Sequence, residues 1–511
     1  MTLLAPSDLA AFAAAAVPLS LWIGAATIRA ATPLADATRA AGVALAAAGV
    51  MVFLALRGPS STSLPVRVDA VSLVLLPLVS ALGLAVTRFS RSYLRGDPRQ
   101  RPYARALLGA LGAACGVALA RDLVALALGW TALSLALHAL LLHFEDRVAA
   151  RVAAHKKFLL SRASDLLLWS AIALVYGALG TTDLDALARA AATPSAPLRL
   201  AAVLFAAAAT VRCAQLPFHG WLTQVMEAPT PVSALLHAGV VNVGGVLLLR
   251  VAPLINHAPE ARAWLLVVGL STAVLAALVS TTRVSVKVAL AWSTCAQMGI
   301  MLAQCGLGAW QLALLHLAAH SLYKADAFLR TGSAVRRWRL LAQRTPDAPA
   351  LHPALALVPG LLAAALAVGA LHAAGMLHAD HAPTLIPQSL LVALALASAQ
   401  PRRLAPTPAG VGTAGLFLGW HLVADRVGAS LPAAPDTAGW WLVVAAFTAV
   451  FVVDAVTRRN PEGALARALH PALFAGLYLD ERLTRLTFRL WPPRLPPVER
   501  PLRTLTQSLE S

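Results

Sequence analysis

The chain has 511 residues, of which 59% are hydrophobic and only 13% are charged. A soluble protein has about a quarter charged residues, so the composition excludes an ordinary soluble domain. A net charge of +18 is typical of nucleic-acid-binding proteins, but here the basic residues lie between apolar segments. We therefore expect a lipid bilayer, and no nucleic acid, as the partner of this charge.

Apolar runs near 20 residues, the length that crosses a bilayer as an α-helix, recur from one end of the chain to the other. They predict an all-α polytopic membrane protein with about 14–15 transmembrane helices. In chain order the predicted spans are 8–29, 36–57, 66–87, 103–119, 122–143, 157–180, 198–223, 231–254, 262–281, 286–305, 309–331, 353–373, 385–400, 408–428 and 438–457.

The loops between these spans differ in charge. The loops that follow odd-numbered spans are rich in Arg and Lys, whereas the loops that follow even-numbered spans hold few, as around Asp183 and Asp185. By the positive-inside rule the basic side is cytoplasmic, and fifteen spans then place the N-terminus outside and the C-terminus in the cytoplasm. The basic loops include Arg88, Arg91, Arg95, Arg99, Arg101 and Arg105, then Arg147, Arg151, Lys156, Lys157 and Arg162, then Arg283 and Lys287.

The composition divides the chain into two regions. Residues 1–457 are predicted to form one transmembrane domain, and residues 458–511 a basic cytoplasmic C-terminal tail. Between Ala464 and Leu490 leucines recur at helical spacing with arginines between them. This pattern indicates an amphipathic helix on the membrane surface or against a partner, with a loosely ordered basic tail as the alternative.

Two features near residues 215–239 predict interrupted helices. The segment Gln215–Trp221 places Pro217 and Gly220 near the end of the seventh span, and proline disrupts the preceding helical turn. Freed backbone groups at membrane depth are tolerated where they line a cavity. Further along, Pro229 and Pro231 predict a turn that enters a new helix.

The segment 309–331 carries the most informative polar pattern. His316, His320 and Lys324 are spaced i, i+4 and i+8, so one face of a helix holds all three. The chain has four lysines, and Lys324 is the only one that we place well inside an apolar span. Ionisable groups in a bilayer are costly and usually serve ion movement, so we interpret this stripe as a proton path rather than a structural polar seam.

Few other polar residues are embedded in apolar sequence: Asp165, Arg212, Glu227 and His237. Each has a plain structural alternative. Asp165 can pair with Arg162 at i+3, and His237 alone can be a satisfied core histidine. Asp326 points away from Lys324 on the helix and is expected to pair with Arg330 instead.

The sequence predicts no metal or cofactor in this chain. His316 and His320 have zinc-compatible spacing, but no HExxH motif or third ligand accompanies them. Phosphate-binding glycine motifs and cysteine clusters are also missing. The four cysteines are scattered, so buried inert thiols are expected, and no basic segment precedes the first span, so we expect no cleaved signal peptide.

The segment Gln215–Gly239 resembles the proton-conducting antiporter-like subunits of respiratory complex I and of Mrp cation antiporters. It contains Leu-Pro-x-x-x-Trp-Leu and Pro-Thr-Pro-Val-Ser-Ala-Leu-Leu-His-Ala. The segments 288–294 and 316–324 share the likeness, which runs from about residue 60 to 335. The resemblance implies two inverted five-helix repeats, each with a broken helix, joined by a central hydrophilic axis.

The chain departs from that pattern in its first half. Members of the superfamily carry a glutamate after a Gly-Trp pair in the fifth span, where this chain has Thr131. They carry a lysine where this chain has Arg212, and arginine stays charged and does not readily relay a proton. The usual first-repeat Glu–Lys couple is therefore missing.

Four local motifs resemble another branch, the DabB-type membrane subunit of DAB inorganic-carbon pumps. They are Ala154–Phe158, Met226–Pro229, Cys305–Ala309 and His320–Ala325. The resemblance implies a two-part complex in a bacterial inner membrane. Its partner is expected to be a DabA-type, zinc-bearing subunit similar to β-carbonic anhydrases, so that zinc belongs to the partner and this chain couples an ion gradient to carbon uptake.

Under this hypothesis Lys324 is the titrating relay, His316 and His320 extend the path, and His237 links it through the broken helix. Arg212 acts as a fixed charge, near Asp165, and Glu227 lies near the cytoplasmic mouth or the partner surface. The chain itself is then a transporter subunit and not an enzyme. Three alternatives stay open: a complex I subunit, an Mrp-type sodium/proton antiporter, and a non-conducting anchor for the partner.

Overall fold

The computed structural model describes residues 6–57, 65–224, 227–333 and 437–492, with isolated positions between 334 and 394. Within these residues the regular structure is helical, and the only strand-like pairings are two isolated bridges. The predicted all-α class is confirmed. The predicted spans 353–373, 385–400 and 408–428 lie almost wholly outside the described residues.

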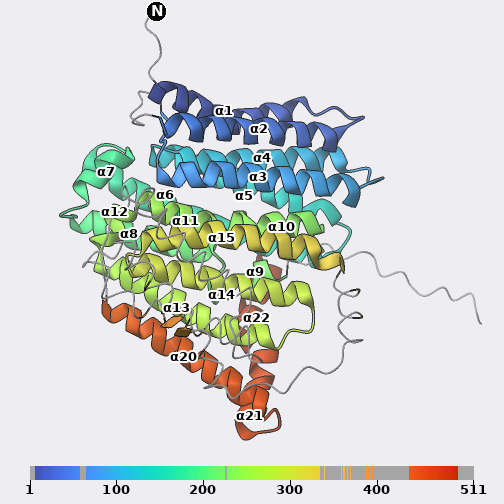
Figure 1. Ribbon diagram of the computed structural model, residues 1–511, viewed down its shortest axis with the longest axis vertical. Coiled ribbons are helices and arrows are strands. Elements are labelled where there is room, and N and C mark those ends of the chain that lie inside the picture. The colour runs from blue at the N-terminus through green and yellow to red at the C-terminus, as the bar shows by residue number, and fades with distance from the viewer. Residues whose placement is uncertain are drawn as a thin grey trace, which may run out of the picture.

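The helices lie side by side in a stack that runs from α1 and α2 at one end to α20 at the other (Figure 1). Ten helical segments of the described chain are long and apolar enough to cross a membrane. The longer helices are α1 (Pro6–Thr27), α2 (Pro33–Ala55), α3 (Ala70–Tyr93), α4 (Gln100–Leu119), α5 (Leu123–Leu141), α6 (Val148–Leu179), α8 (Ala196–Arg212), α13 (Pro259–Thr281), α14 (Val286–Gly306), α15 (Trp310–Leu329) and α20 (Thr437–Arg459).

Polar contacts show which helix ends meet on one side of the stack. Asp69 caps α3 by accepting a hydrogen bond from Ser72 N at 3.1 Å, and it also pairs with Arg250 at 2.5 Å. Arg250 is the last residue of α11 (Val243–Arg250). The first turn of α3 and the last turn of α11 therefore share one side.

The opposite side holds the basic loops. Arg99, before α4, donates to the carbonyl oxygen of His143 at 2.8 Å, and the His143 ring contacts Asp97 at 3.0 Å. Arg147, before α6, pairs with Glu227 at 3.0 Å. The expectation that the loops after the third and fifth spans share one side is confirmed.

The interruption predicted around Pro217 is present. Helix α8 ends at Arg212, Ala214 has a φ of 51°, the Leu216–Pro217 bond is cis, and the short helix α9 (Gly220–Thr223) follows. The next span is also broken, because α10 (Thr230–Ala238) gives way to a 3-10 turn at Val240–Asn242 before α11. The prolines near residue 230 therefore begin a helix that stops nine residues later, within the bilayer-length segment.

The C-terminal segment folds back on the stack. Helix α20 packs against α13, and α21 (Ala464–Phe474) and α22 (Leu479–Leu490) follow it. A left-handed turn at Gly476, Leu477 and Tyr478 separates these two helices. Helix α22 contacts α6 and α9 (Figure 1). The division of the chain at residue 457 stays a prediction.

One expectation about charge is wrong. Lys156 and Lys157 do not lie in a cytoplasmic loop, because α6 already begins at Val148 and both side chains are buried. Lys324 is therefore not the only lysine inside an apolar span. Neither proline nor glycine occurs between Val148 and Tyr176, so nothing local ends the helix before the basic pair.

Candidate ion path

Helix α15 holds Lys324 in the interior of the bundle. Its ammonium group donates to the carbonyl oxygen of Leu290 at 3.0 Å and to Ser293 Oγ at 2.9 Å, both on α14. The side chain is fully buried. Among the residues that the structure describes, no carboxylate pairs with it, so neutral acceptors alone hold this lysine.

The histidines predicted to extend the path lie one and two turns away. His320 is buried, and its Nε2 atom contacts the carbonyl oxygen of His237 at 3.2 Å. His316 contacts Gln304 Oε1 at 3.2 Å, and its ring centroid is 6.0 Å from that of His320. The predicted polar stripe on one face of α15 therefore reaches α10 through the contact between His320 and His237.

His237 comes from α10, at the last turn before the helix breaks. Its Nδ1 atom contacts Thr294 Oγ1 at 3.2 Å, and its ring stacks on Phe328 at 4.3 Å. Asn242, just beyond the break, donates to Ser321 Oγ at 2.8 Å. The broken span thus meets α15 through polar contacts on both sides of its interruption, and we name His237, His316, His320 and Lys324 the α15 cluster.

A second buried polar group lies on α6 and α8. Lys157 donates to the carbonyl oxygen and the hydroxyl of Ser134 at 2.6 and 2.9 Å. Arg212 donates to the carbonyl oxygen of Trp130 at 2.8 Å, and its guanidinium lies 4.8 Å from the Trp130 ring centroid. Both basic side chains are buried. We name Lys157, Arg162, Asp165 and Arg212 the α6 cluster.

Asp165 supplies negative charge to this cluster. It pairs with Arg162 at 2.8 Å and accepts a hydrogen bond from Thr131 at 3.2 Å. The i, i+3 pair expected from the sequence is present, although it lies in the middle of α6 rather than at a helix end. Thr131, at the position that departs from the superfamily, is the residue that bonds Asp165.

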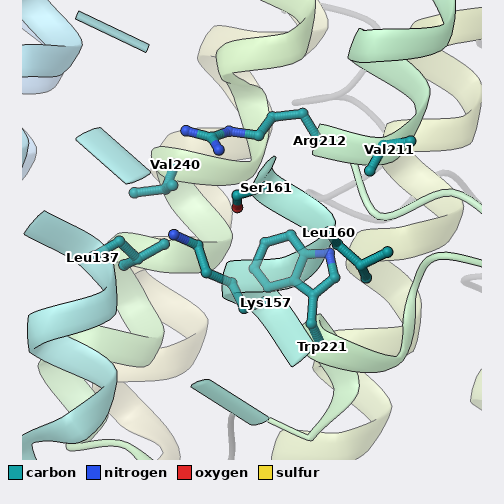
Figure 2. A pocket seen from close by; sticks show the side chains of 8 residues that line it. All are labelled: Leu137, Lys157, Leu160, Ser161, Val211, Arg212, Trp221 and Val240. Carbon is teal, nitrogen blue, oxygen red and sulfur yellow. The ribbon is translucent and has the colours of Figure 1, made fainter. Parts of the chain in front are cut away.

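A small cavity lies beside the α6 cluster, among α5, α6, α8 and α9. Its volume of about 10 Å³ has room for about one water molecule. Figure 2 shows Lys157, Arg212 and Trp221 around it, each from a different segment of the chain. The remaining lining residues are Leu137, Leu160, Ser161, Val211 and Val240.

Two predicted residues lie away from both clusters. Glu227 is paired with Arg147 at the surface, on the side of the stack that carries the basic loops. Asp326 pairs with Arg330 at 2.7 Å, as expected, and not with Lys324. In the part of the chain that the structure describes, no group of three His, Cys, Asp or Glu residues could hold a metal ion.

Lys156 and Lys157 are the residues that the sequence interpretation missed as buried groups. The signal that could have found them is the uninterrupted helical sequence from Val148 onward, which continues the sixth span backward past the basic residues. Several basic residues lie near the predicted start of the sixth span, and because basic residues are common in cytoplasmic loops, this stretch was assigned to a loop.

Comparison with known proteins places these features in a family. Residues 120–377 match the family described as NADH:quinone oxidoreductase/Mrp antiporter, TM. The chain is also 41% identical over 440 residues to "Probable inorganic carbon transporter subunit DabB" of Hydrogenovibrio crunogenus, covering 84% of each chain. The chain belongs to this family, in its DabB branch. The predicted resemblance is confirmed.

Other relatives extend the comparison. "Probable inorganic carbon transporter subunit DabB2" of Halothiobacillus neapolitanus is 36% identical over 457 residues, covering 85% of this chain and 82% of the relative. The NADH-quinone oxidoreductase subunit L of Mycobacterium tuberculosis is 32% identical, over 53% of this chain and 43% of the subunit. Family membership and the ten apolar helices make the chain a multi-pass membrane protein.

Solved structures share the fold. A chain of the Mrp complex from Dietzia sp. superposes with a TM-score of 0.65 at 23% identity, covering 95% of this chain and 59% of that one. A chain of the archaeal membrane-bound sulfane sulfur reductase gives a TM-score of 0.56 at 16% identity, covering 94% and 99%. The antiporter-like fold expected from the sequence is confirmed, and both clusters lie within the residues that match the family.

Proposed function

We propose that this chain is the cation-conducting membrane subunit of an energy-coupled inorganic carbon uptake complex, and that the cation is H+. The relatives that match over more than four-fifths of the chain are named as inorganic carbon transporter subunits. The single observation that carries conduction is Lys324, a buried lysine held by a carbonyl and a hydroxyl, with no carboxylate partner among the described residues.

The contacts of Lys324 suit a proton relay. A carbonyl oxygen and a serine hydroxyl can accept from an ammonium group, and the hydroxyl can also donate to a neutral amine. Within the described part of the chain no ion pair holds the charged form, and burial disfavours that form. Lysine can therefore exchange its proton here, whereas an amine paired with a buried carboxylate would stay charged.

The histidines supply the rest of the path in this proposal. His320 and His316 continue from Lys324 along α15, and His237 links them to the broken span. Imidazole both donates and accepts, so a chain of such groups bridged by water passes protons. Arg212 is a fixed charge that acts with Asp165 on the α6 cluster, and Glu227 lies near the mouth on the basic side.

The partner in the proposed complex is a DabA-type, zinc-bearing subunit similar to β-carbonic anhydrases. In this arrangement the partner hydrates CO2, and ion flow through this chain drives the step so that bicarbonate accumulates. The complex resides in the bacterial inner membrane. The basic loops and the C-terminus face the cytoplasm, and the N-terminus faces the periplasm, as the distribution of Arg and Lys supports.

The decisive experiment uses the purified complex in liposomes that contain a pH-sensitive dye. An imposed proton gradient is expected to produce dye-reported flux that depends on Lys324 and on the partner subunit. Carbon uptake in cells without any flux in the liposomes would instead identify a membrane anchor. Flux that requires sodium and persists without the partner would identify an Mrp-type antiporter.

A further inference from the structure

The C-terminal helix α22 inserts a carboxylate into the buried basic region of the first half. Asp480 accepts hydrogen bonds from Lys156 Nζ at 2.9 Å on both carboxylate oxygens. Lys156 also donates to Gln224 Oε1 at 2.8 Å and to Thr484 Oγ1 at 2.7 Å. The Lys156 side chain is only 1% exposed and that of Asp480 is 23% exposed, so this is a partly buried ion pair between residues 324 positions apart.

The same carboxylate binds helix α9. Gln224, at the end of α9, donates to Asp480 Oδ2 at 2.6 Å. At the start of α9 the carboxylate lies directly against Gly220, where even a Cβ atom would be 1.5 Å from Asp480 Oδ1. Only glycine leaves room for the carboxylate here.

Two aromatic contacts fix the ends of the C-terminal segment. Trp491, just after α22, stacks on His155 with ring centroids 4.0 Å apart. Before α22, Arg283 donates to the carbonyl oxygen of Leu473 at 2.6 Å and lies over the Phe474 ring, 6.0 Å from its centroid. The segment is therefore held against α6 and the end of α13, on either side of Asp480.

These contacts join two of the elements that wall the cavity, α6 and α9. Helix α6 contributes Lys157 and Ser161 to its lining, and α9 contributes Trp221. Asp480 bonds the neighbours of these residues, Lys156 on α6 and Gln224 on α9. One carboxylate therefore neutralises a buried lysine and keeps the two walls together.

We propose that Asp480 is a positioning residue for the α6 cluster: from the C-terminal helix it pairs with Lys156 and pins α6 to α9, closing the Lys157–Arg212 cavity to the aqueous phase. It acts through Lys156 rather than as a relay. The effect on conduction rests on the proposed function, but closure of the cavity does not. Asp480 lies outside the residues that match the family.

Closure is measured in the full chain carrying Ser161→Cys, reconstituted in vesicles and treated with a membrane-impermeant maleimide. Ser161 is buried in the intact protein, so labelling is expected to be slow. Asp480→Asn is expected to speed labelling by about tenfold, because local opening exposes the cavity lining. The same chain without Ser161→Cys corrects for the four native cysteines.

Matched controls separate closure from general damage. Gly220→Ala keeps both charges but removes the space for the carboxylate, and is expected to speed labelling as Asp480→Asn does. Gly177→Ala, on the same α6 with nothing near its added Cβ, is expected to leave labelling unchanged. Asp454→Asn removes a carboxylate that pairs with Arg458 on the surface of α20, and should likewise have no effect.

If Asp480→Asn alone does not fold, the double variant with Lys156→Gln is the substitute, because removing both charges relieves the unpaired lysine. Its labelling is expected to be as fast as that of Gly220→Ala. Unchanged labelling in Asp480→Asn or in the double variant overturns the inference, even if Lys324-dependent flux is intact. Faster labelling in a chain that conducts nothing supports closure and rejects only the proposed function.

Discussion

The α15 and α6 clusters hold a lysine in nearly the same way and surround it differently. Lys324 donates to the carbonyl of Leu290 and to Ser293, and Lys157 donates to the carbonyl and hydroxyl of Ser134. The other three members of the α15 cluster are histidines. The other three members of the α6 cluster are two arginines and an aspartate.

This difference separates two roles for buried charge. Imidazole both donates and accepts hydrogen bonds, and we propose that the α15 cluster passes protons along its length. Arginine keeps its charge, so Arg162 and Arg212 create a fixed positive field at Lys157. In this proposal the α15 cluster transfers protons, and the α6 cluster controls the charge of the one lysine within it.

The largest effect is expected for Lys324→Ala. Carbon uptake and proton flux should be lost while the complex still assembles, because the substitution removes the titrating group but leaves a hydrophobic helix face. Flux in liposomes and copurification of the partner measure the two properties. Lys287→Ala is the matched control, since that lysine also bonds a hydroxyl, Thr230 at 3.0 Å, but is only half-buried. Wild-type uptake in Lys324→Ala would contradict the relay.

Lys157→Met tests the second role. The substitution removes a buried charge that has no carboxylate partner in the described chain, so Tm should stay the same or rise. Flux should fall by about tenfold, the change that roughly 1.4 kcal/mol in a barrier produces. A large fall in Tm with unchanged flux would show that Lys157 is structural and that the two clusters do not work together.

The α15 cluster could be predicted from sequence because three of its members lie on one helix at a fixed spacing. Helical periodicity alone places His316, His320 and Lys324 on one face. His237 was a weaker prediction, since its place beside α15 depends on the packing of α10. That packing follows from the break after Ala238, which brings a polar backbone carbonyl to His320.

The α6 cluster could be found only in part in this way. Its Arg162–Asp165 pair follows from helical spacing, but Lys157 was assigned to a loop and Arg212 comes from α8. The neighbouring Asp480 is 324 positions from Lys156 in the chain, and no periodicity links residues so far apart. For residues 464–490 the sequence offered an amphipathic helix or a loosely ordered tail, and the structure has two helices there, α21 and α22. The leucine spacing gave no sign that Asp480 would bind inside the same chain.

Asp69→Asn tests the helix shared by both clusters. Arg250 and Asp69 tie α11, which contacts α8 and α15, to the start of α3. Burial alone would raise the pKa of Asp69, but Arg250 and Arg67 outweigh it and hold the pKa below its usual value. The pair therefore stabilises the fold above the usual carboxyl pKa, and this contribution is lost as pH falls through the lower folded value.

Because the variant leaves Arg250 buried without its partner, a loss of about 3 kcal/mol in unfolding free energy is expected. Thermal unfolding in detergent at neutral pH measures it, and the difference from wild type should shrink in strong acid. Asp36→Asn, which breaks pairs with the exposed Arg29 and Arg39, is the surface control and should cost less than about 1 kcal/mol. An equal effect of the two substitutions would contradict the buried role of Asp69.

The smallest effect is expected for Glu227→Gln. Arg147 and Glu227 join the start of α6 to the start of α10, and so connect the two clusters at their basic end. Their side chains are 57% and 39% exposed, so water and salt screen the pair and its contribution is about 0.5 kcal/mol or less. Flux should change less than twofold at physiological salt, with any difference largest at low ionic strength. A large, salt-independent loss of flux would instead place Glu227 in the path itself. Conduction would then be controlled on the side of the basic loops rather than at Lys324.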